Sequence, residues 1–181
     1  MAVFDANFVM ALLEPAKARP RDPTTNAVVS QIAERMALLL LTLQQRGEKI
    51  IIPTPALCEF LVHAEEAAPK YVAQFAKSRN FKIADFGRRA AIEAATRLRS
   101  DIDQGDKRGG SPDNWQKVKF DRQIAAIAVA ENDSTIYTSD GGLQNLSRKH
   151  GLTAVDFFEL PIPPDTLPPL LRLLQDEPKS E

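Results

Sequence analysis

The stretch that decides the fold is KFDRQIAAIAVAENDSTIYTSD, residues 119–140. A helix is expected to begin near Asp121, and the run Ile124–Ala130 is apolar on almost every side, as in a helix buried on more than one face. Thr135–Thr138 has the β-branched and aromatic composition of a strand, and a second carboxylate, Asp140, follows it. Open α/β sheets bind ligands at the carboxyl ends of their strands. This unit therefore predicts two acids that face one cleft.

Strands and helices alternate along the rest of the chain. Five segments have strand composition, and helical patterns separate them: Met1–Phe4, Lys49–Ile52, Phe81–Phe86, Thr135–Thr138 and Leu152–Val155. This alternation predicts an α/β fold with a central parallel sheet of about five strands, flanked by helices on both faces. The long helix before the second strand is expected to begin at Thr24 or Thr25. Glycine, aspartate and proline between Ser100 and Gln116 predict an extended loop.

Length and composition predict one soluble domain. The 181 residues carry a formal net charge of -1, so any binding of nucleic acid must depend on a local basic patch. Cys58 is the only cysteine, which excludes an internal disulfide. The sequence contains no recognisable secretory signal and no apolar run of membrane-spanning length, so we expect a cytoplasmic protein without membrane contact. The domain is expected over residues 1–158. A proline-rich arm, 159–181, is expected to pack on the domain or on a partner.

Four carboxylates are expected at one edge of this sheet. Asp5 follows the first strand, and Glu59 lies one turn into the helix after the second strand. Asp121 and Asp140 belong to the central unit, and the topology places all four at the carboxyl ends of the strands. Each acid considered alone has a simpler interpretation. Asp5 can cap a helix, and Glu59 can belong to the polar stripe of its own helix.

The combination of acids predicts metal-dependent chemistry. Carboxylates that lie close together repel unless a cation neutralises them, and an all-oxygen ligand set favours Mg²⁺ or Mn²⁺ over zinc. Such ions suit the hydrolysis of phosphodiester bonds. No Ser-His-Asp pattern or glycine-rich phosphate loop offers a competing chemistry. Basic and aromatic side chains around the start of the central helix are candidate RNA contacts, with a solvated loop as the alternative: Trp115, Lys117, Lys119 and Arg122.

Four motifs resemble the PIN-domain family, and most closely its VapC-like ribonuclease toxins. They are VFDAN at the start, PTPALCEFL after the second strand, KFDRQIAAIAVAE, and TIYTSDGGLQNL followed by GLTAVDF. Together they extend from residue 1 to about 158. The resemblance implies a homodimer and a metal-dependent RNA-cleaving site. It assigns the catalytic and metal-binding roles to Asp5, Glu59, Asp121 and Asp140, supporting polar roles to Asn7 and Thr138, and a phosphate contact to Lys119.

The leading hypothesis is a Mg²⁺- or Mn²⁺-dependent endoribonuclease that acts as the toxin of a type II toxin–antitoxin pair, with a cognate antitoxin as its partner. The alternative is a PIN-fold module without nuclease activity that binds a protein or RNA. A phosphatase of the haloacid dehalogenase type requires a second aspartate two residues after the first, where this chain has Asn7. The segment 14–45 and the loop 100–116 are longer than in typical toxins, and the proline-rich arm is unusual for them.

Overall fold

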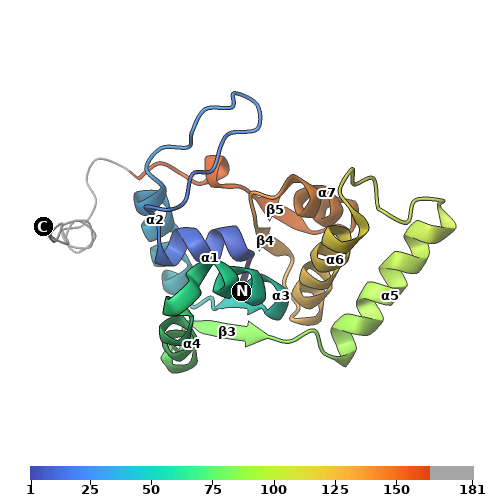
Figure 1. Cartoon of the computed structure of the whole chain (residues 1–181), viewed down its shortest axis with the longest axis horizontal. Coiled ribbons are helices and arrows are strands. Elements are labelled where there is room, and N and C mark those ends of the chain that lie inside the picture. Colours follow the sequence, from blue (N-terminus) through green and yellow to red (C-terminus); the bar gives the residue numbers. More distant parts are fainter. Residues whose placement is uncertain (164–181) are drawn as a thin grey trace, which may run out of the picture.

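Five parallel strands form the centre of the molecule in a computed structural model that describes residues 1–163 (Figure 1). The strand order is β3-β2-β1-β4-β5. The strands are β1 (Ala2–Phe4), β2 (Ile50–Pro53), β3 (Phe81–Ala84), β4 (Thr135–Tyr137) and β5 (Thr153–Val155). The predicted α/β architecture with a five-stranded parallel sheet is confirmed. Most of the predicted arm, residues 164–181 with their leucines, lies outside the described residues.

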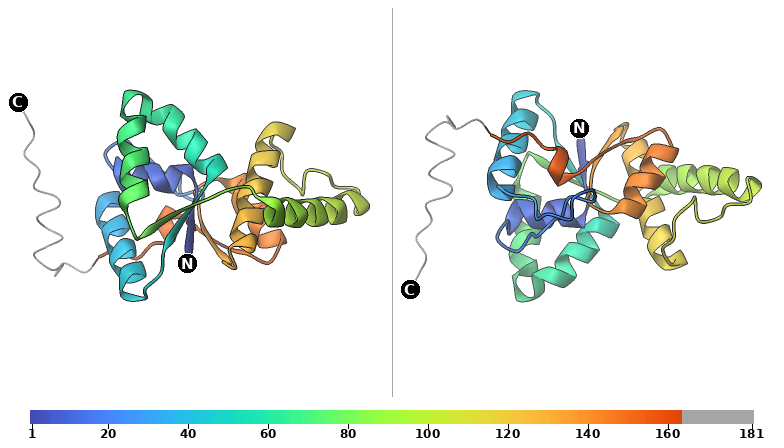
Figure 2. Two further views of the ribbon diagram at one scale, coloured as in Figure 1. Left: turned by 90° about the horizontal axis from the view of Figure 1, so that it is seen from below. Right: turned by 90° about the horizontal axis from the view of Figure 1, so that it is seen from above.

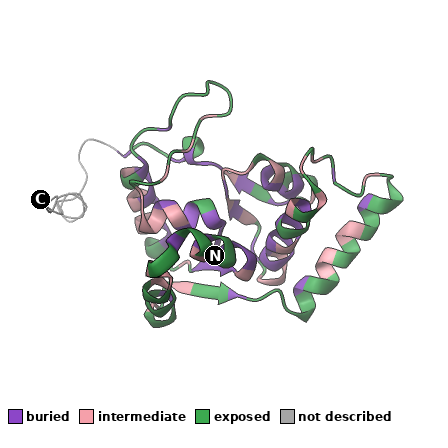
Figure 3. Cartoon of the chain, in the orientation of Figure 1, coloured by how far each residue is buried: buried purple, intermediate pink, exposed green. Residues whose placement is uncertain are grey.

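Helices cover both faces of the sheet (Figure 2). Alternate strand residues point to opposite faces, so Phe4 packs with Phe8 and Phe60 in one core, whereas Val3 packs with Ile127 in the other. Figure 3 shows the resulting buried centre between exposed outer helix surfaces. The helices are α1 (Ala6–Leu13), α2 (Ile32–Gln45), α3 (Thr54–Ala64), α4 (Ala68–Lys77), α5 (Arg88–Asp103), α6 (Trp115–Ala130) and α7 (Gly141–Lys149), with short 3-10 turns η1 (Glu65–Ala67) and η2 (Phe157–Glu159).

Two helices begin at residues other than those predicted. α2 begins at Ile32, because the Asp22 carboxylate accepts a hydrogen bond from the Thr24 backbone N–H at 2.7 Å and holds that segment in a tight turn. α6 begins at Trp115 rather than at Asp121, since the Asn114 side chain caps it by accepting from the Lys117 backbone N–H at 3.0 Å. Asp121 therefore lies inside α6, and the preceding loop is shorter than predicted.

The strand order places a reversal of topology between β1 and β4. From β1 the chain adds β2 and β3 on one side, and it later adds β4 and β5 on the other side of β1. The crevice at the carboxyl ends of the two strands that flank such a reversal is the usual ligand site of an open α/β sheet. Asp5 directly follows β1, and Asp140 lies three residues after the end of β4. The fold thus brings these acids to its most favourable ligand-binding position.

α5 lies at the outside of the molecule and packs against α6 (Figure 1). Within residues 1–163, none of the helices combines the length and the apolar character that crossing a membrane requires.

Candidate metal and nuclease site

A cleft of about 410 Å³ opens at the carboxyl edge of the sheet, beside β1 and β4. All four predicted carboxylates line it, each from a different element: Asp5 before α1, Glu59 on α3, Asp121 on α6 and Asp140 before α7. The predicted support residue Asn7 also lines the cleft. Its remaining walls are formed by Ala6, Pro55, Cys58, Asn114, Gln116, Lys117, Phe120, Ile124 and Leu143.

Thr138 joins the two acids that follow the strands. Its hydroxyl donates to Asp5 Oδ2 and accepts from the Asp140 backbone N–H at 3.0 Å, and its side chain is fully buried. Asp5 Oδ1 also caps α1 by accepting from the Phe8 backbone N–H at 2.9 Å. The simpler interpretation of Asp5 as a helix cap is confirmed. The same carboxylate caps α1 and binds the Thr138 hydroxyl, because each of its two oxygens has its own hydrogen-bond partner.

Burial changes the acidity of the two least exposed carboxyl groups in the cleft. It raises the pKa of Asp5 to about 7, although hydrogen bonds from Thr138 and Phe8 oppose the change. Burial likewise raises the pKa of Asp121 to about 7, and the charge of Asp140 adds to this effect. The charge of Glu59 further raises the pKa of both groups, which places Glu59 electrostatically within the same site. Near neutral pH these two carboxyl groups therefore tend to be protonated, and a bound cation would stabilise their charged form instead.

Asp113 joins this site from the loop between α5 and α6, and no sequence pattern predicts its position there. Carboxylate oxygens of Asp113, Asp121 and Asp140 all lie within 4.8 Å of one another. Lys117 lies between two of them, with its ammonium nitrogen 2.7 Å from Asp113 Oδ2 and 2.7 Å from Asp140 Oδ2. Partial burial lowers the pKa of Lys117, but these hydrogen bonds outweigh it and the pKa is raised overall. Lys117 thus neutralises part of the acidic cluster.

Gly142 leaves the space that this arrangement needs. A Cβ atom at Gly142 would lie 2.5 Å from Asp113 Oδ2 and 3.1 Å from Asp140 Oδ1, whereas a Cβ at the preceding Gly141 would meet nothing within 4 Å. A side chain at position 141 would therefore fit, whereas the absence of one at position 142 lets two carboxylates lie close to the start of α7.

The donor set fits a hard divalent cation. The four acids that line the cleft offer only carboxylate oxygens, and two of them, Asp121 and Asp140, converge with Asp113 within the spacing of a shared ion. The raised pKa values of Asp5 and Asp121 show that their negative charges lack full compensation from protein groups. A Mg²⁺ or Mn²⁺ ion would supply that compensation.

The predicted basic contacts separate into two groups. The ammonium groups of Lys107 and Lys119 lie 4.5 Å and 5.5 Å from the centroid of the Trp115 ring, so both make cation–π contacts with it. Lys119 is exposed on α6 and remains available to solvent. Trp115 itself does not line the cleft, and two cations share its ring. Lys117 does line the cleft, although it is engaged by acids there.

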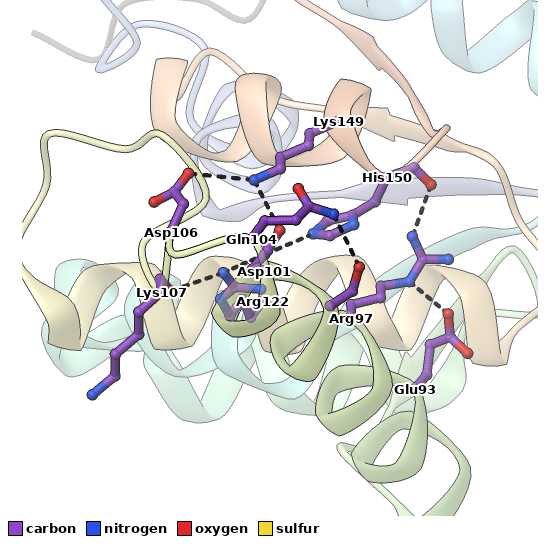
Figure 4. Close-up of polar contacts among 10 residues, drawn as sticks. Glu93, Arg97, Asp101, Gln104, Asp106, Lys107, Arg122, Lys149 and His150 are labelled. Carbon is purple, nitrogen blue, oxygen red and sulfur yellow. Dashed lines mark hydrogen bonds and ion pairs between the residues drawn. The ribbon is translucent and has the colours of Figure 1, made fainter.

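Arg122 does not line the cleft and lies in a buried charge network (Figure 4). Its Nη2 atom donates to Asp101 Oδ2 at 2.6 Å and to the Lys107 backbone carbonyl at 3.0 Å. Lys149 Nζ contacts Asp101 Oδ1 at 2.8 Å, and Arg122 is only 6% exposed. The prediction that Arg122 contacts RNA is therefore wrong. This network instead joins α5 and α7 to the loop that carries Asp113.

No protein-family model matches the chain, and no curated protein matches it in sequence. Solved structures that are similar to it include two VapBC complexes. One is VapBC2 from Rickettsia felis bound to a DNA fragment from its promoter, with 18% identity and a TM-score of 0.52. The other is DNA-bound VapBC from Salmonella typhimurium, with 15% identity and a TM-score of 0.53. Each match covers 86% of this chain and 97% of the other. At these identities the likeness concerns the fold, and the predicted PIN-like fold is confirmed.

Proposed function

We propose that the protein is a divalent-metal-dependent endoribonuclease. The observation that carries this proposal is the meeting of four carboxylates from four separate elements in one cleft at the reversal of strand order. Two of these groups have a pKa raised to about 7, which is the electrostatic condition that a cation relieves. When bound, Mg²⁺ or Mn²⁺ lowers the pKa of an attacking water and stabilises the charge that develops on the phosphate.

The residues of the chain take distinct roles in this proposal. Asp5, Asp121 and Asp140 hold the metal, and Glu59, which is exposed at the cleft, is a further ligand or orients the attacking water. Thr138 fixes the Asp5 carboxylate through its hydroxyl hydrogen bond. Asn7 adds a polar group to the cleft wall, and Lys119 is an exposed ammonium suited to a phosphate. These assignments agree with those that the PIN-domain resemblance implies.

RNA cleavage by the purified protein tests the proposal. We expect the protein to cut RNA in Mn²⁺ or Mg²⁺, EDTA to stop the reaction, and Asp5→Asn to abolish it. Asp103→Asn is the matched control, because Asp103 lies on the outer helix α5 with a side chain 54% exposed. Cleavage that continues in EDTA, or in the Asp5→Asn variant, would contradict the proposal. A folded protein that binds Mn²⁺ but leaves RNA intact would favour the binding module instead.

Both similar structures are VapBC complexes, and this supports a toxin role with a cognate antitoxin. The test is expression of the chain in a bacterial host, alone and together with the protein encoded by the neighbouring reading frame. We expect growth to stop with the chain alone, to continue with the Asp5→Asn variant, and to be restored by the neighbouring protein. Growth arrest that the neighbouring protein does not relieve would contradict the pairing. The homodimer stays a prediction, which the mass of the purified protein in solution checks.

A further inference from the structure

Phe120 is an aromatic side chain whose exposure the core does not explain. It is 52% exposed, more than any other phenylalanine in residues 1–163, whereas Phe4, Phe8 and Phe60 are fully buried. Phe120 lines the cleft and directly precedes Asp121 in α6. Its position in the cleft, beside the acids, means that a ligand bound there could cover the apolar ring and remove its surface from water.

The cleft around this ring combines apolar surface with hydrogen-bonding groups. Phe120 and Ile124 of α6 line it together with Pro55 and Cys58 of α3. Three amide side chains line the same cleft and offer hydrogen-bond donors to it, although the oxygen of one already accepts from the Lys117 backbone N–H: Asn7, Gln116 and the capping residue Asn114. A flat ligand with apolar faces and polar edges matches these surfaces, and this is the chemistry of a nucleobase.

The size of the cleft favours the binding of one nucleotide at a time. Its volume of about 410 Å³ lies at the lower end of ligand pockets. A base inside a duplex has both faces covered by its neighbours and its edge paired, so it must leave the stack to lie against a protein ring. An unpaired base meets no such barrier.

We infer that the Phe120 ring stacks on a nucleobase next to the bond that is cut. This inference rests on the proposed nuclease function. It assigns the stacking role to Phe120 rather than to Trp115, whose ring is shared by the ammonium groups of Lys107 and Lys119. The acids and their metal act on the phosphate, while Phe120 fixes the base beside it.

Substitutions of Phe120 test the inference through kinetics on a single-stranded RNA. We expect Phe120→Ala to lower kcat/KM for the single strand about 5- to 100-fold, mainly through KM, because one base–ring stack is lost. Phe120→Leu keeps an apolar side chain and should stay impaired, whereas Phe120→Trp should restore cleavage. Phe86→Ala is the control, since Phe86 is also exposed but lies outside the cleft.

Two results would overturn the stacking role: unchanged kinetics in Phe120→Ala, or full activity in Phe120→Leu. The melting temperature and its increase with Mn²⁺ should be the same in all Phe120 variants, which separates stacking from folding and metal binding. If the wild-type protein cuts no RNA, the nuclease proposal fails independently. The anisotropy of a labelled single-stranded RNA in Ca²⁺ then decides the inference, which requires weaker binding by Phe120→Ala than by the wild type.

Discussion

Raising the pH of the metal-free protein should destabilise it through Asp5 and Asp121. Each has a pKa of about 7 in the folded protein against an ordinary value of 3.8. Because the folded state holds these protons more tightly, its stability is greatest below the ordinary value and falls as pH rises through about 7. At about 1.4 kcal/mol per pH unit, the whole window corresponds to about 4 kcal/mol for one group. Between pH 5 and pH 8 one such group should therefore lose about 3 kcal/mol of its contribution to the free energy of unfolding.

The assay is urea unfolding in EDTA at pH 5 and pH 8, for the wild type, Asp5→Asn and the control Asp103→Asn. Burial lowers the pKa of His150, which makes stability rise over part of this range, so the informative quantity is the difference between variants. Asp5→Asn should reduce the loss by about 3 kcal/mol relative to the wild type, and the control should not change it. Mn²⁺ at 100 times its dissociation constant should return about 2.7 kcal/mol at pH 8. Equal pH dependence of all three proteins would refute this account of the acids.

Three further substitutions or modifications test separate parts of the structure. Gly142→Ala should weaken Mn²⁺ binding about 10-fold in a calorimetric titration, because the new methyl group displaces the Asp113 carboxylate. The control Gly141→Ala should bind Mn²⁺ as the wild type does, and equal affinities of the two variants would exclude Asp113 from the metal site. Asp101→Asn should lower the free energy of unfolding by about 3–5 kcal/mol, since it leaves the buried Arg122 charge without its partner. The exposed control Asp103→Asn should lower it by less than about 0.5 kcal/mol, and similar losses for both variants in urea unfolding would contradict the buried network. Alkylation of exposed Cys58 at the cleft should slow RNA cleavage, while the Mn²⁺-dependent rise in melting temperature persists. In the Cys58→Ser variant the alkylating reagent should no longer slow cleavage, and wild-type cleavage that alkylation leaves unchanged would show that RNA binds outside this cleft.

The sequence predicted the sheet and the position of the acids because both follow from chain topology. Strands that alternate with helices form a parallel sheet, and residues directly after such strands gather at one edge. Asp5 and Asp140 were placed correctly for this reason. Glu59 and Asp121 reach the same cleft from helices that begin or run beside that edge.

The residues that sequence reasoning missed or misplaced lack such a rule. Asp113 lies in an irregular loop, where no periodicity predicts the direction of a side chain. Phe120 precedes an apolar helix run and resembles a core residue, yet it faces the cleft. Arg122 follows the cleft residue Asp121 directly, but consecutive helix residues point about 100° apart, so its side chain enters the α5–α6 contact. The sequence does contain an acid with which Arg122 could pair, Asp101, near the end of the preceding helix.

Anomalous diffraction at the manganese edge, from crystals of the protein grown with Mn²⁺, tests the central claim most directly. The claim is that carboxylates from four elements of the fold form one divalent-metal site. We expect a peak bonded to oxygens of Asp5 and Asp140, with Asp121 as a direct ligand or through water, and no peak in crystals of the Asp5→Asn variant. Manganese bound only elsewhere on the surface, with the cleft acids left without an ion, would contradict it.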